Sequence, residues 1–494
     1  MNDQNDQNGK LNHADVQGNI LRGYRRQRVR YLMLKVAGAT AARRWLTASL
    51  TGADGVPQIT TESEKRWGSK PETCFNIGLT YEGLRALGTP AASLADFPTE
   101  FIEGMTKRAA KLGDVGPSGP ENWEKPFDKP AQIHLIASIY AGDCKKPDAA
   151  GEIAQLDAVQ RAVVDGKWGM SLLGTRDGWC FNKDYVHFNY ADNISQPKFE
   201  EIHTTDDYGD YPDGDSQPMA PLGTVLLGYE TNFEGLKWRV PRPPQLGYNG
   251  SFNAFRVLEQ DVVCFEEYLT TAADYLLHDP KANLLLPPGT ESNIGEGLSR
   301  RDALREVVAA NMCGRWRNGV PLALSPDTPS PSKPVSKTNF DYDGDSRCPY
   351  GAHIRRCNPR GAQIVQRVAN HSRRLVRRGM PYGPAYVYDP AKPRDPNEPK
   401  RGLLGNFIGA NLGAQFEAMS CDWLNLGLQD PRVTGSNDPL LGANDPVTSW
   451  FDLPLPGGDK IRLRKLPRFV TTKGGAYTFL PSISAIGYLG SLSG

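Results

Sequence analysis

The segment Cys348-Pro-Tyr-Gly-Ala-His-Ile-Arg-Arg-Cys-Asn-Pro-Arg360 places one histidine, His353, among small residues and follows it with three arginines. Imidazole is a good iron ligand, and the glycine and alanine before it leave room for a flat porphyrin to approach the backbone. Arg355, Arg356 and Arg360 could pair with two propionates, because a guanidinium matches a carboxylate with two hydrogen bonds. The residues alone also fit a second interpretation, since a single histidine near arginines is more often a satisfied structural residue.

That segment resembles the proximal-haem signature of the dye-decolorising peroxidases, which reads approximately C-P-x-x-A-H-I-R-x-x-N-P-R. The resemblance covers most of the chain, and the length and the Gln-Gly-Asn-Ile opening resemble the larger, advanced members of that family. It implies an α+β fold of two duplicated ferredoxin-like domains, with antiparallel sheets, helices and haem held mainly by the C-terminal domain. Further matching segments follow in the family's order, at 15–23, 188–197, 377–383, 410–417 and 474–481.

The resemblance implies a haem-dependent peroxidase that uses hydrogen peroxide to oxidise a small organic substrate through a ferryl intermediate. Such an enzyme needs an iron ligand, a group that moves a proton between the peroxide oxygens, and a positive charge near the breaking O–O bond. His353 is the predicted sole protein ligand of haem b, since the chain has no C-x-x-C-H attachment site. The resemblance gives the other two roles to Asp192 and to Arg377, the first arginine of its pair.

Two aspartates are candidates for the distal acid/base, the group that moves a proton between the peroxide oxygens. The literal G-x-x-D-G match is Gly174-Thr-Arg-Asp-Gly178, but the family's flanking Phe and Ile-Ser-Gln-Pro surround Asp192. We therefore predict that Asp192 is the distal acid/base and that Asp177 lies in a turn. Around Asp192 both motif glycines have become asparagine, Asn189 and Asn193. Asparagine is the non-glycine residue that best tolerates left-handed backbone angles, so the loop conformation can survive.

Other residues are predicted to line the haem site. The family packs an apolar Leu-x-Phe pair over the distal haem face, and we place the corresponding positions at Asn406 and Ile408. His371 fits either the haem edge or a structural hydrogen bond. A proximal histidine normally donates its second N–H to an acidic or carbonyl partner, and Asn411 and Glu417 are both open for that role.

The substitutions at 189, 193, 406 and 408 all fall where the family's distal pocket is expected. They leave two alternatives open beside the peroxidase. One is an enzyme of the same fold whose altered pocket acts on a specific metabolite. The other is a haem carrier or sensor without catalysis.

Composition restricts the partners. The 57 lysines and arginines balance 56 acidic residues, so no global field favours nucleic acid or an acidic membrane. No window approaches the length of an apolar membrane span, and no apolar leader is evident. Eight separated cysteines without a C-x-x-C pair argue against a zinc ribbon or a disulfide-rich secreted scaffold. We expect a cytoplasmic protein; the sequence leaves monomer and homo-oligomer open.

The periodicity of apolar residues predicts alternating strands and helices in two cycles. The predicted domains are a flexible segment at 1–25, an N-terminal domain at 26–215 carrying the distal loop, and a haem-binding C-terminal domain at 216–494. Loops are predicted at 206–214, 324–338 and 391–401. Strands are predicted at 28–36, 76–80, 132–140, 223–229, 252–257, 402–411 and 476–480, and helices at 41–50, 81–87, 152–164, 260–277 and 414–426.

Overall fold

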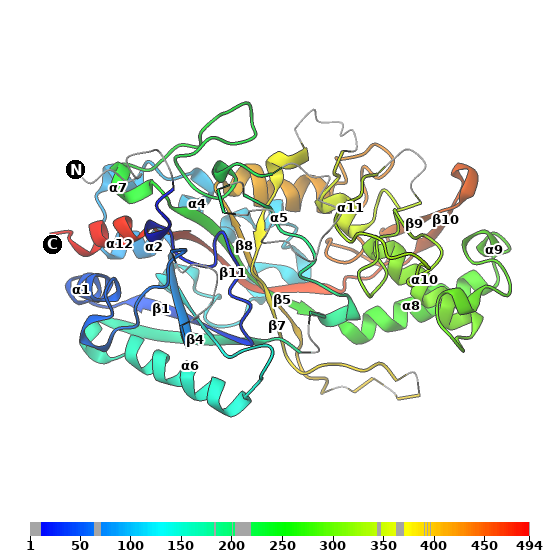
Figure 1. Ribbon diagram of the computed structural model, residues 1–494, viewed down its shortest axis with the longest axis horizontal. Helices are drawn as coiled ribbons and strands as arrows, with labels where there is room; N and C mark the ends of the chain where they lie inside the picture. Colours follow the sequence, from blue (N-terminus) through cyan, green and yellow to red (C-terminus); the bar gives the residue numbers. More distant parts are fainter. Residues whose placement is uncertain are drawn as a thin grey trace.

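One antiparallel sheet runs through the middle of the molecule (Figure 1). Its strands follow the order β4-β1-β3-β2-β11-β5-β8-β6, and β7 also pairs with β8. The computed structural model describes residues 11–63, 71–181, 184–199, 201–202, 219–342, 347–361, 370–389, 391–392, 394–395 and 397–493.

The N-terminal half forms a first ferredoxin-like unit. Its order β4-β1-β3-β2 is that of a split βαβ arrangement, in which the first and third strands occupy the centre. Apolar side chains such as Val29 and Leu32 on β1 are fully buried, which explains the central position of that strand. The elements are β1 (Arg28–Val36), α1 (Ala39–Ser49), β2 (Thr73–Leu79), β3 (Leu135–Ala141), α6 (Ala149–Val163) and β4 (Met170–Trp179).

The C-terminal half repeats the same order with β11-β5-β8-β6. The two units meet where β11 pairs with β2, at Phe479 and Leu79. This repetition confirms the predicted α+β, duplicated ferredoxin-like fold, while the boundary at residue 215 stays a prediction. The elements are β5 (Ser251–Gln260), α8 (Val262–Leu277), β6 (Val376–Arg377), β7 (Met380–Tyr382), β8 (Gly402–Gly409), the π-helices η14 (Leu412–Glu417) and η15 (Met419–Asn425), and β11 (Val470–Leu480).

Additional elements surround this frame. Helix α10 (Arg300–Cys313) packs against α8, and α12 (Ile483–Gly490) packs against α1 (Figure 1). Strands β9 (Trp450–Pro454) and β10 (Lys460–Arg464) form a separate hairpin. Short helices complete the fold: α2 (Tyr81–Ala86), α3 (Ala91–Leu94), α4 (Thr99–Glu103), α5 (Ala109–Leu112), α7 (Pro244–Gly247), α9 (Ala282–Leu285) and α11 (His353–Cys357).

Among the residues that the structure describes, no helix combines the length and the apolar character needed to cross a bilayer.

Three local predictions need correction. Asp177 lies in β4, not in a turn, and its carboxylate accepts two hydrogen bonds from Arg30 on β1 at 2.8 and 2.7 Å. The apolar run 223–229 is not a strand; its buried start belongs to the 3₁₀ turn η11 (Leu222–Thr224). The predicted helix 414–426 is two π-helical segments. The predicted loop at 206–214 lies outside the described residues.

The chain from residue 11 to 25 is packed into the molecule, which corrects the expected flexible segment for this part. Val16 and Ile20 are fully buried. The Gln17 amide donates to the carbonyls of Ile77 and Pro481, at 3.0 and 2.8 Å. Arg378 donates to the carbonyls of residues 19, 20 and 21. Local polarity suggested flexibility, but contacts with both halves of the sheet order this part of the chain.

Candidate active site

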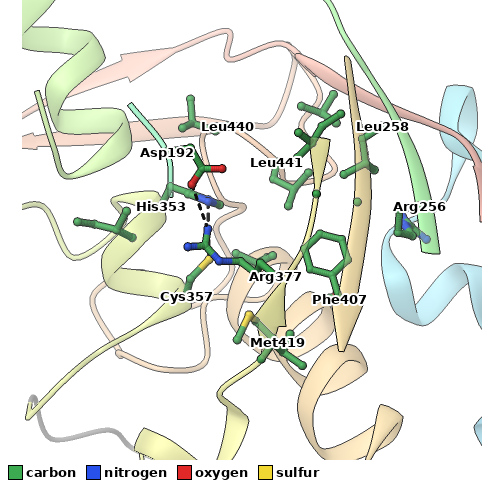
Figure 2. Close-up of a pocket in the computed structure, with 18 of the residues that line it drawn as sticks. Asp192, Arg256, Leu258, His353, Cys357, Arg377, Phe407, Met419, Leu440 and Leu441 are labelled. Carbon is green, nitrogen blue, oxygen red and sulfur yellow. Dashed lines mark hydrogen bonds and ion pairs between the residues drawn. The ribbon is translucent and has the colours of Figure 1, made fainter. Parts of the chain in front are cut away.

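A cavity of about 400 Å³ opens beside β5 and β8. Figure 2 shows the side chains that line it, with Arg377 pointing toward Asp192. His353 lines the same cavity, so the three residues predicted to carry the chemistry come together. The walls are largely apolar, with Leu258, Phe407, Phe416, Met419, Leu424, Leu440 and Leu441 among them.

His353 begins the short helix α11 and is held by a buried carboxylate. Its Nδ1 lies 3.0 Å from Oδ2 of Asp438, whose side chain is fully buried. The other oxygen of Asp438 accepts the N–H groups of Leu440 and Leu441, at 2.9 and 2.8 Å. Burial lowers the pKa of His353, but Asp438 and the Cys357 thiol more than offset it, and the net pKa is raised. Nδ1 is thus occupied, which leaves Nε2 as the ring nitrogen for a ligand.

Asp438 was not among the candidates for this partner. Asn411 instead caps η14, accepting the N–H of Ala414 at 2.7 Å. Glu417 is buried and binds Arg108, at 2.9 and 2.7 Å, and the hydroxyl of Tyr477. Asp438 is 85 residues from His353 in the chain, so no local spacing could have indicated the pair.

The distal loop brings Asp192 close to Arg377. Nη1 of Arg377 lies 3.7 Å from Oδ1 of Asp192, and both side chains are nearly half exposed. The backbone N–H of Arg377 donates to Gln196 Oε1 and its Nη2 donates to the Ser195 carbonyl, both at 2.9 Å. The segment 195–196, just after Asp192, therefore fixes the position of the arginine.

The asparagines of this loop adopt the backbone angles that glycine would. Asn189 has φ +60° and Asn193 has φ +58°. Both lie in the left-handed region, which asparagine enters more readily than most side chains. Both asparagines thus adopt the left-handed angles that we expected them to tolerate.

Of the three arginines after His353, two lie away from the cavity. Arg360 lines the cavity. Arg355 does not; it donates to the Cys348 carbonyl and lies over the ring of Tyr350. Arg356 is almost fully buried. Its guanidinium donates hydrogen bonds to the backbone carbonyls of residues 351, 423 and 436 and to the Ser436 hydroxyl. Arginines from elsewhere in the chain also line the cavity, among them Arg315 and Arg374.

Strand β8 presents the face opposite to the one predicted. Gly405 and Phe407 line the cavity, whereas Asn406 and Ile408 point to the other side of the sheet. There they line a small pocket of about 30 Å³ near Gln17. Successive side chains of a strand point to opposite faces of the sheet. Placing the motif one residue too far along the chain therefore selected Asn406 and Ile408 in place of Gly405 and Phe407. The placement of Asn406 and Ile408 over the haem is therefore corrected.

His371 does not line the cavity. Its Nδ1 lies 3.2 Å from Nη2 of the cavity-lining Arg374. Of the two interpretations left open, the structural hydrogen bond describes its position.

The chain is similar to dye-decolorising peroxidases over nearly its whole length. The family model described as "DyP dimeric alpha+beta barrel domain" matches residues 15–163. "Multifunctional dye peroxidase DyP2" of Amycolatopsis sp. is 29% identical over 95% of this chain and 94% of its own length. "Peroxidase 2" of Mycetinis scorodonius is 26% identical, covering 96% of this chain and 87% of that protein. The chain belongs to the dye-decolorising peroxidase family.

Solved structures agree with this assignment. An ancestral D-type dye-decolorising peroxidase superposes with a TM-score of 0.74 and 26% identity, covering 97% of this chain and 98% of the other. A dye-decolorising peroxidase in complex with 2,6-dimethoxyphenol has a TM-score of 0.74 and 25% identity, covering 97% of this chain and 100% of that one. As a dye-decolorising peroxidase, the protein is an enzyme that oxidises organic substrates with peroxide.

Dye-decolorising peroxidases are in general haem enzymes, and the donor set in this cavity fits such a group. An imidazole with one nitrogen already engaged by a carboxylate is a typical proximal ligand. The apolar walls suit a porphyrin face. The cationic Arg315, Arg360 and Arg374 supply the charge that propionates require.

Proposed function

We propose that this chain is a haem b peroxidase in which His353 holds the iron and Asp192 and Arg377 act on the peroxide. The observation that supports this most directly is that one cavity contains all three side chains, with His353 Nδ1 held by Asp438. Bound haem would supply the iron that activates peroxide and accepts the oxidising equivalents. The cytoplasmic location stays a prediction.

The proposed roles of the two polar side chains follow from their chemistry. The Asp192 carboxylate takes a proton from one peroxide oxygen and returns it to the oxygen that leaves as water. Arg377 cannot lose its proton at working pH, so its guanidinium stabilises the negative charge that develops as the O–O bond breaks. The 3.7 Å separation keeps both groups close to one small ligand.

The proposed cofactor contacts differ from the sequence prediction. Arg360 is retained, and Arg315 and Arg374 replace Arg355 as residues for the propionates. Phe407 and Gly405 replace Ile408 and Asn406 as the side of β8 that faces the cavity.

The alternative of an altered distal pocket loses much of its support. Two of the four substitutions behind it, Asn406 and Ile408, lie on the opposite face of the sheet. The other two, Asn189 and Asn193, keep the left-handed loop. We therefore propose a substrate class of small phenols, for which a related peroxidase in complex with 2,6-dimethoxyphenol provides the example.

The experiment compares the two aspartates that each match part of the family's motif. Asp192→Asn should lose about 10²–10⁴-fold in peroxide-dependent oxidation of 2,6-dimethoxyphenol, the range that a positioned acid/base contributes. Asp177→Asn, in β4, should keep the wild-type rate. Haem content from the absorption spectrum must match in all three proteins. A fully active Asp192→Asn variant with normal haem content would refute the proposed role.

A further inference from the structure

The loop before Asp192 has a backbone that needs outside support. Phe188 has φ +68° and Asn189 has φ +60°. A left-handed asparagine is unexceptional, but a left-handed phenylalanine is uncommon and persists only when surrounding contacts hold it. Residues 186–189 form a tight turn, in which the N–H of Asn189 donates to the Val186 carbonyl at 3.1 Å.

One residue, Arg317, provides contacts on both sides of this loop. Its Nη1 donates to the Phe188 carbonyl at 2.6 Å. Its own carbonyl accepts the N–H of Ala191, the residue next to Asp192, at 2.7 Å. Side chain and backbone of Arg317 thus bind the loop at positions 188 and 191.

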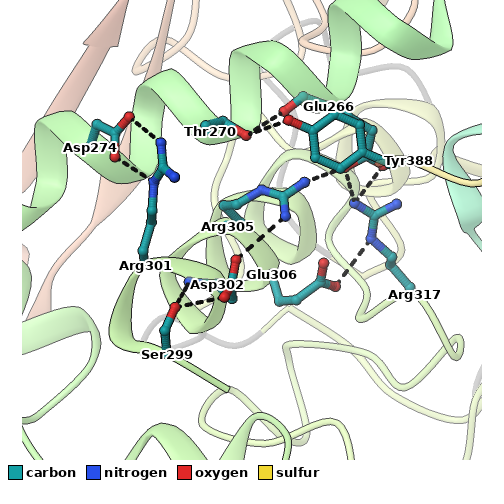
Figure 3. Close-up of polar contacts among 10 residues, drawn as sticks. All are labelled: Glu266, Thr270, Asp274, Ser299, Arg301, Asp302, Arg305, Glu306, Arg317 and Tyr388. Atoms are coloured by element: carbon teal, nitrogen blue, oxygen red, sulfur yellow. Dashed lines mark hydrogen bonds and ion pairs between the residues drawn. The ribbon is translucent and has the colours of Figure 1, made fainter. Parts of the chain in front are cut away.

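Arg317 is itself anchored by two acidic residues (Figure 3). Its guanidinium lies 3.0 Å from Glu266 on α8 and 3.1 Å from Glu306 on α10. The rings of Phe265 and Tyr190 lie 5.6 and 5.7 Å from it. Because Glu266 is only 6% exposed and Arg317 15%, solvent weakens this pairing little.

We propose that Arg317 is a positioning residue for Asp192, connecting the distal loop to the α8–α10 helix pair. The inference rests on the proposed function of Asp192. Arg317 suits this role because its planar guanidinium can bind two carboxylates and a carbonyl in different directions, which a lysine ammonium does less well. Loss of these contacts would release the left-handed turn and move Asp192 relative to Arg377.

The first test needs no haem. In the apo protein, Arg317→Gln should raise amide hydrogen exchange across 188–193 at least about tenfold, because local opening no longer breaks the arginine contacts. Arg305→Gln is the matched control, since Arg305 binds Glu266 at 2.9 Å but not the loop. Arg301→Gln removes a surface pair with Asp274 on the same two helices. Equal exchange in Arg317→Gln and Arg305→Gln would overturn the proposal.

The second test is a double-mutant cycle on the rate of reaction with peroxide. Arg317→Gln should lower kcat/KM for peroxide about 10–100-fold at normal haem content, since small displacements of a catalytic group have effects of that size. In the Asp192→Asn background the same change should cost less than about twofold, because it acts through Asp192. Equal losses in both backgrounds would show a general structural effect and refute positioning.

The outcomes separate the two proposals. A normal rate in Asp192→Asn contradicts the proposed function. A large loss in Asp192→Asn with none in Arg317→Gln contradicts only the positioning role. If Arg317→Gln does not fold, Arg317→Lys retains the charge beside Glu266 and should show an intermediate loss; a wild-type rate and wild-type loop exchange in that variant would refute the need for the guanidinium.

Discussion

Glu62 is a buried carboxylate that binds the packed N-terminal segment. Only 4% of the residue is exposed. Its Oε1 accepts the N–H groups of Leu21 and Arg22, at 2.9 and 3.2 Å. Burial raises the pKa of Glu62 to about 7, and these N–H groups and the charge of Arg378 offset only part of that rise. Glu62 should therefore make the stability of the protein depend on pH.

The sign follows from the direction of the shift. The pKa of Glu62 in the folded protein, about 7, is above its ordinary value of 4.5, so the folded state binds the proton more tightly. Its contribution to the free energy of unfolding is fully present below pH 4.5 and is lost as the pH rises to 7. The size of the loss is about 3 kcal/mol, at about 1.4 kcal/mol for each pH unit between the two values.

Glu62→Gln removes the titration and keeps an oxygen for the two N–H groups. The measurement is the melting temperature of wild type and variant from pH 4.5 to 7.5 by calorimetry. For a chain of this length, 3 kcal/mol corresponds to about 3 °C, so the difference between the two proteins should change by about that amount in favour of the variant. Glu296→Gln, at an exposed position, is the control. Parallel profiles for wild type and Glu62→Gln would refute the reasoning.

Three other predictions concern residues in or next to the candidate site. Asp438→Asn removes the charge behind His353, and we expect haem affinity or the peroxide rate to fall about 10–100-fold, measured by haem titration and stopped-flow absorption; unchanged values would mean that the carboxylate only orients the ring. Asn193→Gly should change the peroxide rate less than about twofold, because φ is already +58°. A tenfold gain would show that the amide obstructs the site. Burial lowers the pKa of His187 to about 4 from 6.5, so its stabilisation is present above pH 6.5 and is lost as the pH falls through 4. As the pH falls from 6.5 to 4, the free energy of unfolding of His187→Gln should decrease by about 3 kcal/mol less than that of the wild type. Identical pH profiles of thermal stability for the two proteins would contradict this.

The sequence predicted the fold best where periodicity is unambiguous. The strand at 28–36 has the predicted bounds, because a run rich in apolar residues ends there, just before a glycine. Strand β4 was missed, since Gly174 and Gly178 suggest a turn and the strand lies at one end of the sheet order, where polar residues are tolerated. The run 223–229 is apolar because it is buried, and burial does not by itself identify a strand.

For the site, motifs located the residues that we propose to act, but not those that contact and hold them. His353, Asp192 and Arg377 lie in short segments with recognisable neighbours, and they converge on one cavity. Asp438 and Arg317 come from distant parts of the chain and make their contacts only in the folded protein. Alternate residues of β8 face the cavity and the opposite side of the sheet. Aligning the motif one residue out of place therefore assigns every side chain of the strand to the wrong face.

The distal loop shows why a departure from a motif need not change the backbone conformation. Glycine is common in such loops because it has no side chain to oppose positive φ, but Asn189 and Asn193 adopt those angles here. Phe188 adopts them too, and no intrinsic preference favours that. Its conformation must therefore come from tertiary contacts, and the 2.6 Å hydrogen bond from Arg317 to its carbonyl is one of them. If those contacts hold the loop, then its conformation depends less on which residues occupy the motif positions than on the pairing of Arg317 with α8 and α10. Substitutions at Glu266 should accordingly impair peroxide chemistry more than a return to glycine improves it.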